Sequence, residues 1–189
     1  AVVEVENTDT WKWFLSNLKS DLGIVNTEPW TIMSDKQKGL IKGVRQHFPD
    51  AEHMHCVRHI WQNFQQTHKG DVLKNQLWKC ARSTTPEPWA ASMEEMKVIS
   101  IEAYKWLEQL PPNTWVRGFQ RELVKCDILL NNNCEVFNKY ILEAREMHLR
   151  SMIDKIKTQL MVRFYNKRNE AETWHGSICP KIRKRIEKN

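Results

Sequence analysis

Two acidic residues in this sequence stand where a carboxylate could act in catalysis. Asp35 follows the apolar run of residues 30–33, which predicts a short strand, and precedes a helical pattern that begins at Lys36. Open α/β sheets bind ligands outside the carboxyl ends of their strands, so this position suits a functional carboxylate. Glu135 stands at the start of another predicted helix. Together the two acids could hold a divalent ion such as Mg²⁺, because hard cations take oxygen ligands and assist phosphoryl transfer.

Each acid also has a purely structural explanation. Ser34 with Gln37 three residues later has the pattern of a capping box, and Asp35 itself favours the positive end of a helix. Asn132 with Glu135 has the pattern of a second capping box. On the residues alone, capping and metal binding both stay open.

A second group of candidate side chains crowds residues 53–59. Cys56 and His59 form a CxxH pair that would share a helix face if a helix begins there, which is half of a zinc site. The other half is not evident, so the residues favour a packed thiol and a hydrogen-bonded histidine over zinc. The histidines of this group are His53, His55 and His59, and the remaining cysteines, all isolated, are Cys80, Cys126, Cys134 and Cys179.

The elements that would position these residues follow an α/β order at the start of the chain. Residues 1–6 alternate valine with glutamate, which predicts a strand, and a helix then runs to Gly23. The strand at 30–33, the helix from Lys36 and a short strand within 52–57 follow. Strands that alternate with helices indicate a parallel sheet.

Beyond residue 60 the pattern becomes helical. We expect helices at 58–82, 87–109 and 115–125, and a long helix from about residue 134 to about residue 170. The tryptophans of these helices are assigned to packing, since such residues are more often core than base-stacking surface. They are Trp61, Trp78, Trp89 and Trp106.

Composition narrows the class of protein. A hydrophobic content of 41% and nine tryptophans exclude a disordered chain. Residues 155–189 carry ten Lys or Arg against three Glu, which suits a polyanion such as nucleic acid, although a solvated surface helix would look the same. Five cysteines without CxxC spacing and no apolar leader favour a reducing, intracellular compartment, and no apolar run is long enough for a membrane span. The motifs GxxxxGK[ST], GxGxxG, HExxH and GxSxG are absent.

Three stretches read together resemble the plant Mutator-like (MuDR) transposase domain, over residues 1 to about 175. They are AVVEVENTDTWKWFLSNLKSDLG, TIMSDKQKGLIKGVRQHFPDAEHMHCVRHIWQNF and CDILLNNNCEVFNKYILEAREMHLRSMIDKIKTQLMVRF. The SDKQKGL segment with its following CxxH, and the NNxxExFN segment, carry the resemblance most specifically.

The resemblance implies a DDE transposase with an RNase H-like α/β core, interrupted by a helical insertion and followed by a long carboxyl-terminal helix. Asp35 would match the second catalytic Asp and Glu135 the catalytic Glu, both binding Mg²⁺ or Mn²⁺, while Cys56 and His59 match a family motif of open role, with zinc as a second candidate. Such an enzyme cuts and pastes DNA, and its partners would be terminal-repeat and target DNA in the nucleus, with no membrane and with a homo-oligomer as a candidate state. The predicted DNA-binding residues of the basic end are Lys181, Arg183, Lys184 and Arg185.

The resemblance also places the first catalytic Asp on a strand upstream of residue 1. We therefore expect the chain to be a truncated domain with an incomplete triad and low stability, and leave its status as an enzyme open. The alternative is a transposase-derived DNA-binding or regulatory protein without catalytic activity. The expected division is a transposase domain at 1–175 and a basic tail at 176–189. Within the domain we expect a sheet part at 1–59, a helical insertion at 60–125 and a region around the catalytic-Glu helix at 126–170.

Overall fold

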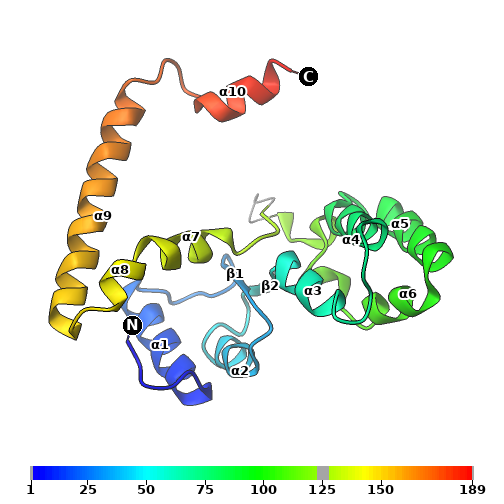
Figure 1. Cartoon of the computed structure of the whole chain (residues 1–189), viewed down its shortest axis with the longest axis horizontal. Helices are drawn as coiled ribbons and strands as arrows, with labels where there is room; N and C mark the ends of the chain where they lie inside the picture. The colour runs from blue at the N-terminus through cyan, green and yellow to red at the C-terminus, as the bar shows by residue number, and fades with distance from the viewer. Residues whose placement is uncertain (1, 123–127, 189) are drawn as a thin grey trace. The chain divides into compact units, whose positions relative to one another are not determined.

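The computed structural model describes residues 2–122 and 128–188. The chain forms two compact units, Ala1–Asn133 and Cys134–Asn189, and each is described by itself (Figure 1). Cys126 and residues 123–125 of a predicted helix lie outside the described residues.

The first helix, α1 (Thr8–Asp21), is capped by local hydrogen bonds at its start. Oδ1 of Asn7 accepts from the amide of Thr10 at 2.9 Å, and Oγ1 of Thr10 accepts from the amide of Asn7 at 3.0 Å, which completes a capping box. Gly23 follows the helix at φ 62°, a left-handed conformation that glycine adopts without strain. The predicted helix is confirmed.

The strand predicted at residues 1–6 is wrong. The described part of this segment is exposed and pairs with no strand of the described sheet. Its polar groups instead bond to α1, because Oγ1 of Thr10 donates to the carbonyl oxygen of Val5 at 2.9 Å and Nε1 of Trp11 donates to Oε1 of Glu6 at 3.2 Å. A strand needs a neighbouring strand to satisfy its backbone, whereas the start of this helix supplies local partners.

The described sheet consists of two parallel strands, β1 (Thr31–Ser34) and β2 (Glu52–His55), joined through α2 (Lys38–His47). Ser34 lies opposite His55, so the carboxyl ends of both strands meet at one edge. These strands and the helix between them confirm the strand–helix–strand part of the predicted α/β opening.

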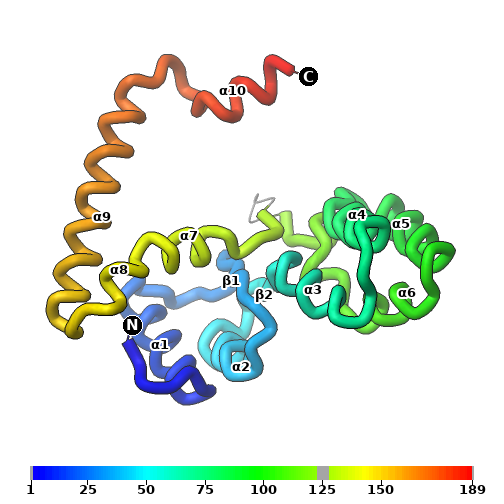
Figure 2. The backbone as a smooth tube through the Cα atoms, viewed as in Figure 1, coloured from blue at the N-terminus to red at the C-terminus, as the bar shows by residue number. Residues whose placement is uncertain are grey.

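The helices α1 and α2 lie side by side (Figure 2) and approach each other through two glycines of α2. A β-carbon at Gly39 would lie 2.9 Å from the backbone nitrogen of Thr8, and one at Gly43 would lie 2.9 Å from Cδ1 of Leu15. The small residues therefore let the two helices pack closely against each other. The buried apolar side chains of this part are Leu15, Ile24, Val44 and Phe48.

The rest of the first unit is helical, as predicted, but its helices are shorter than expected. The run expected at 58–82 is interrupted after Phe64, and Gly70, at φ 112°, precedes the start of α4. Ser100, in extended conformation, ends α5 and starts α6. Residues 115–122 contain a short 3-10 turn, Arg117–Phe119, in place of the α-helix expected there. The helices are α3 (Val57–Phe64), α4 (Asp71–Arg82), α5 (Pro86–Ile99), α6 (Ile101–Glu108) and a 3-10 turn at Pro112–Thr114.

These helices enclose a hydrophobic core of their own. Trp61, Trp78, Trp89 and Trp106 are partly buried against it, which confirms their assignment to packing. The core reaches Leu129 in the segment that leads to the second unit. Its largest fully buried side chains are Trp115, Phe64, Ile60, Leu77, Met96 and Leu107.

The second unit contains α7 (Asn132–Tyr140) from Cys134 onward, α8 (Leu142–Arg145), α9 (Leu149–Glu172) and α10 (Pro180–Ile186). The single long helix predicted here is broken twice before α9. The breaks let Tyr140 reach α9, where its hydroxyl donates to the carbonyl oxygen of Gln159 at 2.8 Å. Among the described helices, none combines the length and the apolar character needed to cross a membrane. The chain is thus a helix-rich α/β protein.

Candidate active site

The loop after β1 holds Asp35 in a local turn. Oδ1 of Asp35 accepts from the amide of Gln37 at 3.1 Å, and Oε1 of Gln37 accepts from the amide of Leu40 at 2.5 Å. Gln37 is therefore the N-cap of α2, and the capping box expected of Ser34 and Gln37 is wrong because the helix begins at Lys38. Asp35 itself is half-buried at the sheet edge predicted for it.

Ser34 links the two strands at this edge. Its hydroxyl donates to the carbonyl oxygen of Asp35 at 2.7 Å and lies 2.7 Å from Nε2 of His53. A serine hydroxyl has one proton, so with that proton on the carbonyl of Asp35 it accepts from a protonated Nε2 of His53. This assignment leaves the lone pair of His53 on Nδ1. Burial, followed by the charge of Arg45, lowers the pKa of His53.

His55 lies two residues further along β2, at its carboxyl end. Burial lowers its pKa to about 4, and the nearby His53 and Lys36 lower it as well, against the opposing effect of Asp35. Its Nδ1 is buried without a hydrogen-bond partner in the part of the chain that the structure describes. Burial also lowers the pKa of Lys36.

The arrangement therefore places uncharged imidazoles beside a carboxylate. A neutral imidazole offers one ring nitrogen as an acceptor, so His53 and His55 can each take a proton or a hydrogen bond from a bound group. Sequence reasoning noted both residues but gave them no role. The available signal was their spacing, since residues two apart in a strand face the same side, and that side also carries Ser34.

Cys56 makes a structural contact at the start of α3. It is 1% exposed, and its Sγ accepts from the amide of Asn131 at 3.2 Å. The neighbouring amide of Val57 donates to the carbonyl oxygen of Leu129 at 2.9 Å. The predicted pair lies across the first turn of α3, where Nδ1 of His59 is buried without a hydrogen-bond partner among the described residues.

Glu135 lies in the first turn of α7 and is half-buried. Asp35 belongs to the first unit and Glu135 to the second, so a shared cation between these two acids stays a prediction. Within residues 2–122 and 128–188, no three His, Cys, Asp or Glu side chains are grouped so that they could hold a metal ion.

The predicted basic residues lie on α10. Arg183 is half-buried, and its Nη2 donates to the carbonyl oxygen of Ile178 at 3.4 Å. A β-carbon at Gly176 would lie 2.7 Å from the same Nη2, so this side chain folds back over the loop before the helix. Arg183 therefore supports the loop as well as carrying charge. The exposed members of the set are Lys181, Lys184 and Arg185.

Comparison with known proteins identifies a family match for the part of the chain that contains β1 and β2. Residues 1–63 match the family model described as the MULE transposase domain. The matched segment contains Asp35, both strand histidines and the CxxH pair, and ends before Glu135. A search of curated proteins found no match. Residues 1–63 of this chain thus form part of a Mutator-like transposase domain.

Proposed function

We propose that the chain is part of the catalytic domain of a DDE transposase with an RNase H-like core, which cuts and joins DNA. The position of Asp35 supports this most directly. Asp35 follows a parallel strand at the sheet edge where ligands of α/β proteins bind, and it lies inside the segment that matches the transposase family. The helical part expected at residues 60–125 corresponds in this proposal to the insertion that interrupts the core.

The metal-binding part of the proposal assigns Asp35 and Glu135 as ligands of Mg²⁺ or Mn²⁺. Carboxylate oxygens suit these ions, but no set of three candidate ligands is grouped among the described residues. Asp35 and Glu135 do not form a complete metal site by themselves. Zinc at Cys56 and His59 is the weaker alternative, because Sγ of Cys56 already accepts a hydrogen bond.

The side chains of the first unit have roles that do not depend on a metal. The Ser34 hydroxyl and His53 fix the backbone at the end of β1, and the turn at Gln37 orients the carboxylate of Asp35. An uncharged His55 adds no positive charge beside that carboxylate. These contacts would present Asp35 in one orientation to DNA or a cation.

A double-mutant cycle on cation binding tests the shared site. Mn²⁺ binding to the full chain would be measured by calorimetry for the wild type, Asp35→Asn, Glu135→Gln and the double variant. If both acids bind one ion, each single variant loses affinity and the double variant loses little more than either single variant. Asparagine keeps an acceptor for the amide of Gln37, so the thermal melt of Asp35→Asn should change little.

The control is Asp21→Asn, which removes an exposed carboxylate at the end of α1. It should bind Mn²⁺ as the wild type does. Losses that add up independently in the double variant would show that the two acids do not share an ion. Unchanged Mn²⁺ binding in both single variants would remove the metal-binding assignment altogether.

A DNA-binding protein of transposase origin, without catalysis, is the second candidate function. The exposed basic side chains of α10 favour it, because they need no metal site to contact phosphates. Both candidates imply action on DNA, and the proposed partners are terminal-repeat DNA and target DNA. The proposed location is the nucleus, and the proposed assembly is a homo-oligomer.

Cleavage assays separate the two candidates. Nicking of supercoiled plasmid in Mn²⁺, lost in Asp35→Asn, would support the enzyme, whereas DNA binding that Asp35→Asn leaves intact, without nicking, would support the second candidate. Replacing Lys181, Lys184 and Arg185 with glutamine should weaken duplex binding equally across sequences. The slope of log affinity against log salt should shrink by about 0.9 for each phosphate that the variant no longer neutralises.

A further inference from the structure

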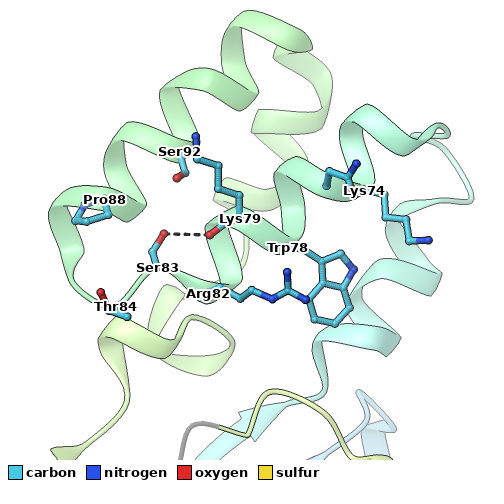
Figure 3. Close-up of a pocket in the computed structure, with 9 residues that line it drawn as sticks. Lys74, Trp78, Lys79, Arg82, Ser83, Thr84, Pro88 and Ser92 are labelled. Carbon is cyan, nitrogen blue, oxygen red and sulfur yellow. Dashed lines mark hydrogen bonds between the residues drawn. The ribbon is translucent and has the colours of Figure 1, made fainter. Parts of the chain in front are cut away.

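The helical part of the first unit contains a cavity that the proposed active site does not use. It has a volume of about 690 Å³, within the range of about 300 to 1,000 Å³ typical of ligand pockets. Side chains of α4 and α5 line it, together with the turn that joins them (Figure 3). The active-site loop after β1 contributes none of its lining residues.

An aromatic and cationic pair forms one wall of this cavity. The guanidinium carbon of Arg82 lies 5.0 Å from the centre of the Trp78 ring, and both side chains come from α4 (Figure 3). Part of Trp78 packs on the hydrophobic core, while the ring also lines the cavity. Flat aromatic and guanidinium groups of this kind are the surfaces on which nucleic-acid bases stack.

The charge of the cavity is positive. Lys79 forms an ion pair with Glu95, and Glu95 also accepts from Nε2 of Gln76 at 2.9 Å, so this lysine is neutralised. Lys74 and Arg82 have no acidic partner among the described residues, and the described lining contains no Asp or Glu. Two positive charges beside an aromatic ring suit a ligand that carries both a phosphate and a base.

The walls of the cavity are fixed before any ligand binds. Nε2 of Gln76 on α4 donates to the carbonyl oxygen of Ser92 on α5 at 2.7 Å, which ties the two helices together. The amide of Gly118 donates to the carbonyl oxygen of Ser83 at 2.8 Å, and a β-carbon at Gly118 would lie 2.7 Å from the backbone of Thr85. The turn between α4 and α5 is therefore held against the neighbouring chain, and little ordering is needed on binding.

We propose that this α4–α5 cavity binds an unpaired nucleotide of a nucleic-acid strand, with its base on the Trp78–Arg82 wall and its phosphate near Lys74 and Arg82. The inference rests on the proposed action on DNA, and adds a site for single-stranded substrate that is separate from the sheet edge and from α10. A duplex shares the phosphate chemistry but keeps its bases stacked inside, so it would use the charges and not the aromatic ring.

Binding measured by fluorescence anisotropy tests the site in the full chain. The probes are a labelled oligothymidylate and a labelled duplex of random sequence. Lys74→Gln combined with Arg82→Gln should weaken oligothymidylate binding and shrink its salt slope by about 1.4, at about 0.7 for each phosphate contact. Trp78→Leu should weaken oligothymidylate binding about fivefold or more and leave duplex binding unchanged.

The matched control replaces Lys97 and Lys105 with glutamine, which removes two exposed lysines of α5 and α6 outside the cavity lining. An equal loss in this control and in the cavity variant would overturn the site. An equal loss of duplex and oligothymidylate binding in Trp78→Leu would overturn the unpaired nucleotide as ligand. Trp78→Phe, which keeps an aromatic ring, should retain most of the affinity and serves if Trp78→Leu does not fold.

The outcome also separates this site from the proposed function. A wild-type chain that binds neither probe would reject both inferences. Binding of the wild type that survives in the cavity variants would reject the cavity alone, and the proposed action on DNA would stand.

Discussion

The amide of Asn131 donates a hydrogen bond to Sγ of Cys56, 75 residues earlier in the chain, at 3.2 Å. Together with the bond from the amide of Val57 to the carbonyl oxygen of Leu129, it holds the segment before α7 against the start of α3. The cysteine of the CxxH pair thus has a structural role that requires no zinc. It fixes the point from which the chain continues to Glu135.

Removing this hydrogen bond should destabilise the first unit. Cys56→Ala leaves the half-buried amide of Asn131 without its acceptor and opens a small cavity, so we expect the free energy of unfolding to fall by about 1 to 3 kcal/mol. Urea titration with an unchanged m value measures the loss, and hydrogen exchange at the Asn131 amide should become faster. The exposed Cys134 provides the control Cys134→Ala, expected within about 0.5 kcal/mol of the wild type. Equal exchange rates at Asn131 in both variants would contradict this role.

The two glycines of α2 should differ in their tolerance of a methyl group. A β-carbon at Gly39 would press on backbone atoms of Asn7 and Thr8, whereas at Gly43 the nearest atom is the end of the Leu15 side chain, which can rotate. Alanine gains about 1 kcal/mol in helix propensity, but overpacking costs about 1 to 3 kcal/mol, so Gly39→Ala should lower stability by up to about 2 kcal/mol. Gly43→Ala should cost less. Thermal melts of both variants that place Gly43→Ala below Gly39→Ala would contradict the close approach of α1 and α2.

The local signals for the elements around the site were readable from the sequence. Gly23 marks the end of α1, and the short apolar run before Asp35 predicted β1. Gly70 and Ser100 also carry local signals in their residue types. Gly70 takes a positive φ, and the hydroxyl of Ser100 accepts from the amide of Ala103 at 3.2 Å. The long helical periodicity concealed both breaks. Propensity therefore found the helical regions but missed the breaks within them.

Other features depend on contacts between distant residues, which propensity cannot supply. The segment at residues 1–6 has a strand pattern but no strand partner in the described sheet. The breaks before α9 accompany the bond between Tyr140 and Gln159, which lie 19 residues apart. The role of Cys56 depends on Asn131, far along the chain. The position of Asp35 was predictable because it needs only the neighbouring strand and helix, while its pairing with Glu135 stays a prediction.

Acid should destabilise the first unit through His55. Its pKa is about 4 in the folded chain and about 6.5 when unfolded, so between these values the unfolded state binds more protons. Stability should be complete above about pH 6.5 and fall as the pH drops toward about 4, and His53, whose pKa is also lowered, acts in the same direction. Denaturant midpoints across this range measure the effect.

A variant without the imidazole isolates this contribution. His55→Gln should flatten the pH dependence of the unfolding midpoint below about pH 6.5, while His175→Gln, at an exposed position of the second unit, should leave it unchanged. Equal slopes in the wild type and His55→Gln would show that burial, together with the charges of His53 and Lys36, does not hold His55 in its uncharged form.

Thiol chemistry provides an independent check on the helical core. Burial raises the pKa of the Cys80 thiol to about 12, whereas Cys134 is exposed on α7. Because the thiolate is the reactive form, only about one in 10⁴ Cys80 thiols would be ionised at about pH 8, before any steric protection is counted. Iodoacetamide should therefore label Cys134 at least about 100-fold faster than Cys80 in native buffer, as mass mapping of the alkylated peptides would show. In denaturant the two rates should converge, and comparable labelling without denaturant would mean that the core around Cys80 opens readily.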